Sequence, residues 1–167
     1  KYVDLHFPPA AKAKVEGMLK NIRGALSQTI DQLEWMTPET KKAAQEKLAS
    51  FHQKIGYPDK WRNYGPVVVK RDDFAGNVQR GNVYEAKYQL AKIGKPLDRG
   101  EWAMTPPTVN AYYNAQMNDI NFPAGVLQPP LYDPKMDDAP SYGNTGGTIG
   151  HELTHGFDDE GRQFDAD

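Results

Sequence analysis

The chain has 167 residues, a formal net charge of −2 and a hydrophobic fraction of 38%. This length suits one domain or a part of a larger one. The low hydrophobic fraction suits either a part that buries its faces against other segments or an ordinary polar helical domain. The balanced charge, without a basic stripe, excludes a nucleic-acid-binding protein. The sequence has no cysteine, so any metal must be held by histidine and carboxylate side chains.

The sequence shows no apolar run long enough to cross a bilayer and no secretory signal. It begins at Lys1 rather than at methionine, so we expect the native start, with any targeting signal, to be missing. The lack of cysteine is compatible with a cytoplasmic protein and with a bacterial protein that is periplasmic or secreted. Of these locations, the bacterial extracytoplasmic one is favoured.

The first half of the chain is predicted to be helical. Between residues 10 and 36, apolar residues recur at steps of three and four, which is typical of an amphipathic helix. Thr37 and Pro38 fit the N-cap and first position of a second helix, which is expected to continue to Ile55. A third helix is predicted from 72 to 93. Six lysines are expected on solvated helix faces: Lys12, Lys14, Lys20, Lys41, Lys42 and Lys47.

Strand-forming residues are concentrated later in the chain. The connector at 61–69 is aromatic and β-branched, and it is a candidate strand. Strands are also predicted at 102–113 and 118–128, with prolines at sheet edges or strand ends. A Gly-rich segment at 142–147 precedes a last helix. Helices followed by a small sheet and a final helix predict an α+β fold.

The segment His151-Glu152-Leu153-Thr154-His155 has the spacing of a zinc site. Residues four apart lie on one helix face, so His151 and His155 can offer two imidazoles to a single tetrahedral zinc ion. Zinc lowers the pKa of a bound water from about 16 towards about 7. Glu152 follows the first histidine directly, and it is placed to take the proton and later deliver it to a leaving amine.

The same pattern can occur on a surface helix with two polar histidines, so its neighbours matter. Gly150 and Gly156 would each cost such a helix about 1 kcal/mol against alanine, and they favour a helix that another backbone approaches closely. The longer motif with a third histidine is excluded, because Asp158 and Gly161 occupy its glycine and histidine positions. A carboxylate from elsewhere should be the third ligand. His6 and His52 are not expected to bind the metal.

Over nearly its whole length, the chain resembles the neprilysin family of zinc metallopeptidases. Four motifs carry the resemblance in the family's order: Lys54-Ile55-Gly56-Tyr57-Pro58-Asp59-Lys60-Trp61, Val109-Asn110-Ala111-Tyr112-Tyr113, the segment 121–130 (NFPAGVLQPP) and the segment 148–159 (TIGHELTHGFDD). The resemblance implies a helical region at 1–97. It also implies the N-terminal part of a thermolysin-like catalytic domain at 98–167, with the substrate strand and the HExxH helix.

The resemblance further implies an endopeptidase with one Zn²⁺ per complete site, which cleaves peptides on the amino side of hydrophobic residues. His151 and His155 would bind the zinc, and Glu152 would be the general base. Asn110 and Ala111 would hold the peptide backbone as an added strand.

Two further pairs of residues receive roles from the family. Val126 and Leu131 would line the pocket for the hydrophobic residue, although Leu131 replaces an aromatic that is common there. Asp158 and Asp159 could orient a histidine ligand, or they could simply be a solvated helix end.

The family's glutamate ligand lies beyond the HExxH helix, and this chain ends at Asp167. We therefore expect the third zinc ligand to come from a missing C-terminal segment, so that the catalytic domain here is incomplete. The alternative is an inactive fragment or non-catalytic module that lacks this ligand. A degenerate peptide-binding relative is disfavoured, because the His-Glu-His set is intact.

Overall fold

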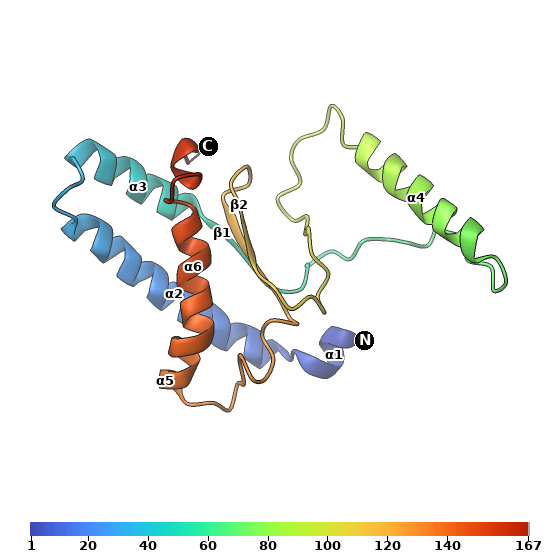
Figure 1. The fold of residues 1–167 in the computed structure, drawn as a ribbon, viewed down its shortest axis with the longest axis horizontal. Helices are drawn as coiled ribbons and strands as arrows, with labels where there is room; N and C mark the ends of the chain where they lie inside the picture. Colours follow the sequence, from blue (N-terminus) through green and yellow to red (C-terminus); the bar gives the residue numbers. More distant parts are fainter. Residues whose placement is uncertain (167) are drawn as a thin grey trace. The chain divides into compact units, whose positions relative to one another are not determined.

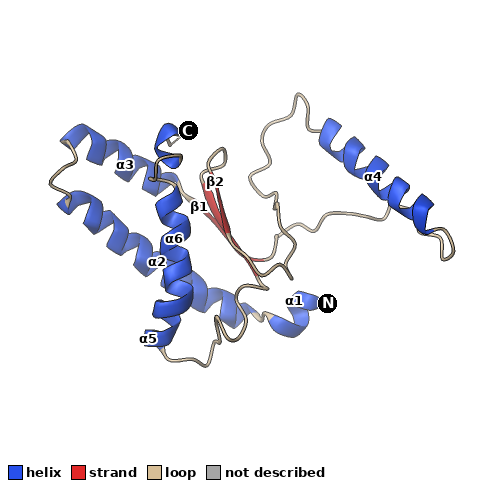
Figure 2. Ribbon diagram, in the orientation of Figure 1, coloured by secondary structure: helices blue, strands red, loops and turns tan. Residues whose placement is uncertain are grey.

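The computed structural model describes residues 1–166 and divides the chain into two compact units. Residues 1–58 and the segment from Trp102 onward form the first unit, and residues 59–101 form the second. Helices accompany one small sheet, which confirms the predicted α+β class (Figure 2). The predicted boundary between 97 and 98 refers to the domains of a whole peptidase, and it stays a prediction.

Three helices open the first unit: α1 (Tyr2–His6), α2 (Pro9–Gln32) and α3 (Pro38–Ser50). Figure 1 shows α2 and α3 side by side, joined by a short turn. The start of α3 is as predicted, with Pro38 in the first turn and the Thr37 hydroxyl accepting the Thr40 amide at 3.2 Å. None of the helices within residues 1–166 is both long and apolar enough to cross a membrane.

The prediction that the second helix reaches Ile55 is wrong. The helix α3 ends at Ser50, and the strand β1 (His52–Gly56) follows directly. The apolar spacing of Leu48, Phe51 and Ile55 fits a helix, so the local pattern gave no sign of a strand. The strand is instead created by parallel pairing with β3, a segment far along the chain. This is tertiary context overriding a local preference.

The sheet has three strands in the order β1-β3-β2, where β2 is Tyr112–Asn114 and β3 is Asp119–Pro123. The predicted strand at 118–128 exists but is shorter than expected. The prediction of a strand at 102–113 is largely wrong, because β2 covers only 112–114 and residues 102–111 form turns and loop. Every residue of the central strand β3 is buried, and Pro123 lies at its end, as proline in a strand requires. Among the described residues, β2 has a strand partner on one edge only.

The core of the first unit lies between the sheet, α2 and the helix α6 (Gly147–His155). Figure 1 shows α6 crossing α2 beside the sheet. Fully or almost fully buried apolar side chains from all three fill the space: Val15, Leu19, Ile120, Phe122, Ile149 and Leu153. Their burial fixes α6 against the sheet.

The second unit is built around α4 (Phe74–Leu90), whose N-cap Asp73 accepts the Gly76 amide at 3.0 Å. The candidate strand at 61–69 is wrong, since these residues form turns and extended loop. Arg62 from this connector lies over the ring of Tyr88, with its Cζ 3.7 Å from the ring centroid. Cation–π contact and turn formation have replaced strand pairing there.

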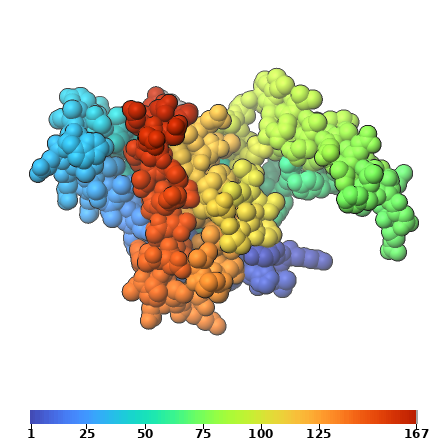
Figure 3. All heavy atoms as spheres, viewed as in Figure 1, coloured from blue at the N-terminus to red at the C-terminus, as the bar shows by residue number. Residues whose placement is uncertain are grey.

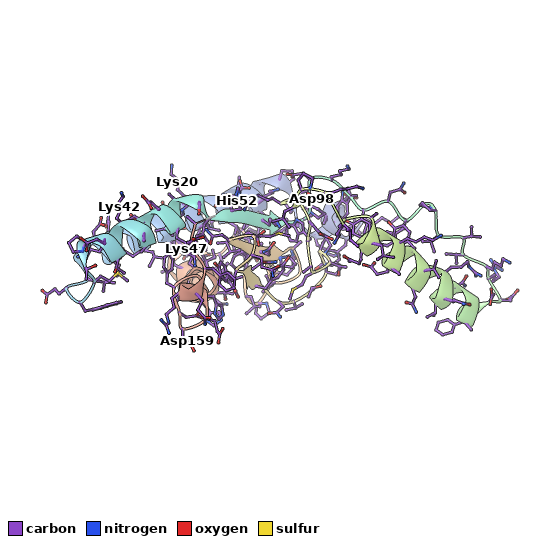
Figure 4. The ribbon with its side chains drawn as sticks, turned by 90° about the horizontal axis from the view of Figure 1, so that it is seen from above. Lys20, Lys42, Lys47, His52, Asp98 and Asp159 are labelled. Carbon is purple, nitrogen blue, oxygen red and sulfur yellow. The ribbon has the colours of Figure 1, made fainter. Side chains whose placement is uncertain are left out.

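One of the six lysines predicted on solvated faces is buried. Lys47 is only 5% exposed, and its Nζ donates to the carbonyls of Gly161 at 2.6 Å and Phe164 at 2.7 Å. Figure 4 shows Lys47 on the side of α3 next to the chain's last helix, while Lys20 and Lys42 lie on the outer side. The C-terminal segment folds back over α3, and the residues around Lys47 give no sign of this packing.

Candidate metal centre

The helix α6 separates its apolar residues and its two histidines onto two faces. Ile149 and Leu153 are four residues apart, and both are fully buried. His151 and His155 are offset by two positions, so they project from the opposite face, where His151 is exposed and His155 is half-exposed. Burial of the first face therefore presents the imidazole pair to solvent.

The two imidazoles converge on one point. The Nε2 atoms of His151 and His155 are 3.0 Å apart, and the ring planes are inclined by 80°. Two Zn–N bonds of about 2.0–2.1 Å at a tetrahedral angle would separate the nitrogens by roughly 3.3–3.4 Å. The observed separation is close to this value, so the pair fits a shared zinc ion.

Asp158 contacts the outer side of one imidazole. Its Oδ2 is 2.7 Å from Nδ1 of His155, while its Oδ1 accepts the amides of Gly161 at 2.8 Å and Glu160 at 3.1 Å. The Gly161 amide first, and then His155, hold the pKa of Asp158 below its usual value. A carboxylate on Nδ1 favours the tautomer that leaves the Nε2 lone pair for a metal. Asp159 is exposed instead.

We expect Asp158→Asn to weaken zinc binding by about 10–100-fold. The single oxygen of Asn can either accept the Gly161 and Glu160 amides or face Nδ1 of His155, but it cannot do both. Competition with a chelator in the full-length protein would measure this. Asp159→Asn is the matched comparison, and we expect a change below about twofold because its carboxylate is exposed. A larger effect at Asp159 than at Asp158 would reverse the assignment.

Glu152 lies on the buried side of the pair, with only 6% of its surface exposed. Burial raises the pKa of Glu152, while His151, His155 and a hydrogen bond from the backbone amide of Tyr113 oppose this shift. Tyr113 belongs to β2, which packs against α6. Figure 3 shows α6, in orange and red, against the yellow-orange segment that includes β2.

The residues expected to hold a peptide lie in two places around α6. Asn110 and Ala111 immediately precede β2, and the Asn110 Oδ1 accepts the Ala111 amide at 2.9 Å. Val126 is buried and follows β3, while Leu131 is 36% exposed. The Leu131 carbonyl accepts the hydroxyl of Thr145 at 3.0 Å, which ties its loop to the turn before α6. Their roles stay predictions.

The described residues contain no complete metal site. Within 1–166, no group of three or more histidine, aspartate or glutamate side chains is arranged to hold a metal ion. His6 lies in α1 and His52 begins β1, so the structure places neither on the helix that carries the imidazole pair. The packing of β2 against α6 beside Glu152 was missed from the sequence, since a contact between distant segments leaves no residue-type signal.

An HExxH helix beside an open sheet edge is typical of zinc-dependent peptidases. The chain belongs to peptidase family M13, because two models of that family match residues 1–58 and residues 110–167. This confirms the resemblance to the neprilysin family.

Known proteins align with nearly the whole chain. Human neprilysin is 40% identical over 174 residues, which cover 99% of this chain and 23% of neprilysin. An endothelin-converting enzyme homolog from Locusta migratoria is 41% identical, covering 93% of this chain and 22% of that protein.

Two solved structures share the fold. A Mycobacterium tuberculosis zinc metalloprotease in complex with an inhibitor superposes with a TM-score of 0.93 and 50% identity, covering 99% of this chain and 25% of that one. PepO from Lactobacillus rhamnosis also gives a TM-score of 0.93, with 36% identity and coverage of 99% and 26%. The chain thus spans about a quarter of the length of these relatives.

Proposed function

We propose that the protein containing this chain is a zinc-dependent endopeptidase. The observation that carries the proposal is the convergence of the His151 and His155 Nε2 atoms, 3.0 Å apart, beside the buried Glu152. Membership in a peptidase family and the likeness to a zinc metalloprotease support it.

The residues of this chain have separable parts in the proposed reaction. His151 and His155 would hold the metal through Nε2, and Asp158 holds the second imidazole through Nδ1. Zinc, when bound, polarises the scissile carbonyl and makes water a better nucleophile at neutral pH. Glu152 removes a proton from the attacking water and transfers it to the leaving nitrogen. The packing of α6 against β2 keeps the buried Glu152 carboxylate in place.

The proposed substrate is an oligopeptide bound as an added strand next to β2. The edge of β2 away from β3 supports this mode, since an extended peptide can add to a sheet at a strand edge. Asn110 and Ala111 would contact the peptide backbone. Val126 and Leu131 would receive a hydrophobic side chain, so that cleavage falls on its amino side. A location outside the bacterial cytoplasm stays a prediction.

We expect Asn110→Ala to lower kcat/KM by about three- to tenfold, the value of one hydrogen bond, with little change in stability. Asn110 is exposed, so its removal leaves no cavity. Steady-state kinetics on several peptides, beside a thermal unfolding curve, would measure both effects. The exposed Asn144→Ala is a suitable comparison, since its side chain contacts only the Pro130 carbonyl at 3.3 Å. Equal kcat/KM for Asn110→Ala and wild type would contradict the substrate role.

The third zinc ligand is proposed to come from a segment of the whole protein outside these 167 residues. Catalytic zinc sites use three protein ligands and leave one position open, whereas residues 1–166 offer a pair. The same observation favours a second candidate for the isolated chain, a non-catalytic module that cannot hold zinc tightly.

Zinc stoichiometry separates these two candidates. After dialysis against trace-metal-free buffer, we expect the isolated 167-residue chain to retain well below one zinc ion, since it lacks a third ligand. The full-length protein should retain about one. One zinc per isolated chain would mean that a carboxylate within the chain completes the site. No zinc in the full-length protein would contradict the peptidase assignment.

A further inference from the structure

The C-terminal turn of α3, residues Lys47–Phe51, touches both the metal-binding helix and the strand pair β2–β3. None of its residues belongs to the HExxH motif or to the expected substrate strand. The turn nevertheless belongs to the same unit as α6 and the β2–β3 strands, and it contacts both.

Lys47 holds the segment that follows the metal-binding helix. Its buried ammonium donates to the carbonyls of Gly161 and Phe164 at 2.6 and 2.7 Å. Burial lowers the pKa of Lys47, and the carboxylates of Asp165 and Asp158 counteract this. A buried cation with two carbonyl acceptors fixes the path of the backbone there, since losing either bond would leave a buried charge unsatisfied.

That backbone segment in turn orients a metal ligand. The Gly161 amide donates to Asp158 Oδ1 at 2.8 Å, and Asp158 Oδ2 lies 2.7 Å from Nδ1 of His155. Gly161 is packed so closely on the end of α6 that a Cβ would overlap the His155 carbonyl oxygen. An unbroken chain of contacts therefore runs from Lys47 through Gly161 and Asp158 to His155.

Phe51 fills the space between the helix and the strand. Its ring stacks on Phe157, just after α6, with centroids 5.9 Å apart, and on Tyr113 of β2, with centroids 5.5 Å apart. A Cβ at Gly156 would overlap this ring, so a glycine is required for the helix end to approach it. The ring thus sets the spacing between α6 and β2, the strand whose Tyr113 backbone lies near Glu152.

Two residues from other segments hold the turn in place, so it can in turn hold the segments that contact it. Arg23 of α2 donates through Nη2 to the carbonyls of Leu48 at 2.5 Å and Ala49 at 2.7 Å, which satisfies the end of the helix. Asn118 in the β2–β3 turn donates to the Lys47 carbonyl at 3.1 Å and to the Ser50 hydroxyl at 2.8 Å.

We propose, on the basis of the function proposed above, that Lys47 and Phe51 are positioning residues of the active site. Lys47 orients the His155 ligand through Gly161 and Asp158. Phe51 sets the distance between Glu152 and the strand that receives the peptide. Each acts through other residues, and neither touches the substrate or the metal.

The test for Lys47 uses Lys47→Met in the full-length protein, with Lys42→Met as the control. Lys42 lies on the same helix, but its side chain is 79% exposed. We expect Lys47→Met to weaken zinc binding by about tenfold, the lower end of the range for residues that orient a ligand. Lys42→Met should leave it unchanged. The double variant with Asp158→Asn should lose less than the product of the single losses, because both act on His155.

The test for Phe51 uses Phe51→Leu, which removes the stacked ring and keeps an apolar side chain. We expect kcat to fall by about tenfold or more, since small misplacements of reacting groups are costly. Zinc affinity should change by less than about twofold, because Phe51 does not support a ligand. This variant also keeps the inference testable if Lys47→Met does not fold.

The inference is overturned if Lys47→Met and Lys42→Met bind zinc equally, or if Lys47→Met and Asp158→Asn act additively. It is also overturned for Phe51 if Phe51→Leu turns over peptides like wild type. A wild-type protein without zinc or peptidase activity would instead contradict the proposed function, so the two failures are distinguishable.

Discussion

Replacing Glu152 by Gln in the full-length protein is expected to lower kcat by about 10³-fold or more, while zinc remains bound. General acid–base catalysis contributes about 10²–10⁴-fold, and an amide can neither accept nor deliver the proton. Gln keeps the size of the buried side chain, so the packing of α6 against β2 should be preserved. The expected fall in kcat should therefore come from the lost proton transfer rather than from altered packing.

Peptide hydrolysis measured beside zinc content would check this expectation. Glu160→Gln is the matched control, since Glu160 is exposed and close in sequence. Its side chain contacts Gln163 alone, at 3.4 Å, so activity should be unchanged. Turnover near that of wild type in Glu152→Gln would remove the general-base assignment. Loss of zinc together with activity would mean that Glu152 acts on the metal instead.

Replacing His155 by Ala is expected to weaken zinc binding by more than about 100-fold, the upper end of the loss seen for residues that only orient a ligand. The Nε2 of His155 is one of two nitrogens aimed at the same point, 3.0 Å apart. Without it, only the imidazole of His151 remains of the pair on α6. Peptidase activity should fall in parallel, because the metal-dependent step needs a fixed ion.

Equilibrium dialysis against a chelator series would measure the affinity of His155→Ala. His52→Ala is the comparison, since His52 begins β1 and is exposed, outside the pair on α6. We expect it to bind zinc like wild type. Unchanged binding in His155→Ala, or an equal loss in both variants, would contradict the assignment of the metal centre to α6.

Several features of the site could be predicted from local sequence. The four-residue spacing of His151 and His155 places both imidazoles on one helix face, and the structure shows their nitrogens converging. Thr37 and Pro38 mark the start of α3 as predicted, because capping is decided by neighbours within one turn. The α+β order was also accessible, since each strong helix has its own apolar period.

Other features were not accessible, because they depend on residues far apart in the chain. The segment 52–56 carries a helical apolar spacing, yet it is a strand because β3 pairs with it. Lys47 resembles its exposed neighbours in sequence, yet the segment that follows α6 folds over it and accepts its two hydrogen bonds. Of two adjacent aspartates, only Asp158 contacts His155.

The sequence by itself identified the kind of site that this chain contributes to. A histidine pair at helical spacing and an adjacent glutamate define a zinc-type site, because helix geometry is local. The tertiary structure alone decided how that site is held: the packing of β2 against α6 beside Glu152, the carboxylate of Asp158 on His155, and Phe51 between helix and strand. These contacts arise from the packing of distant segments, and packing follows from the whole core rather than from any one pattern.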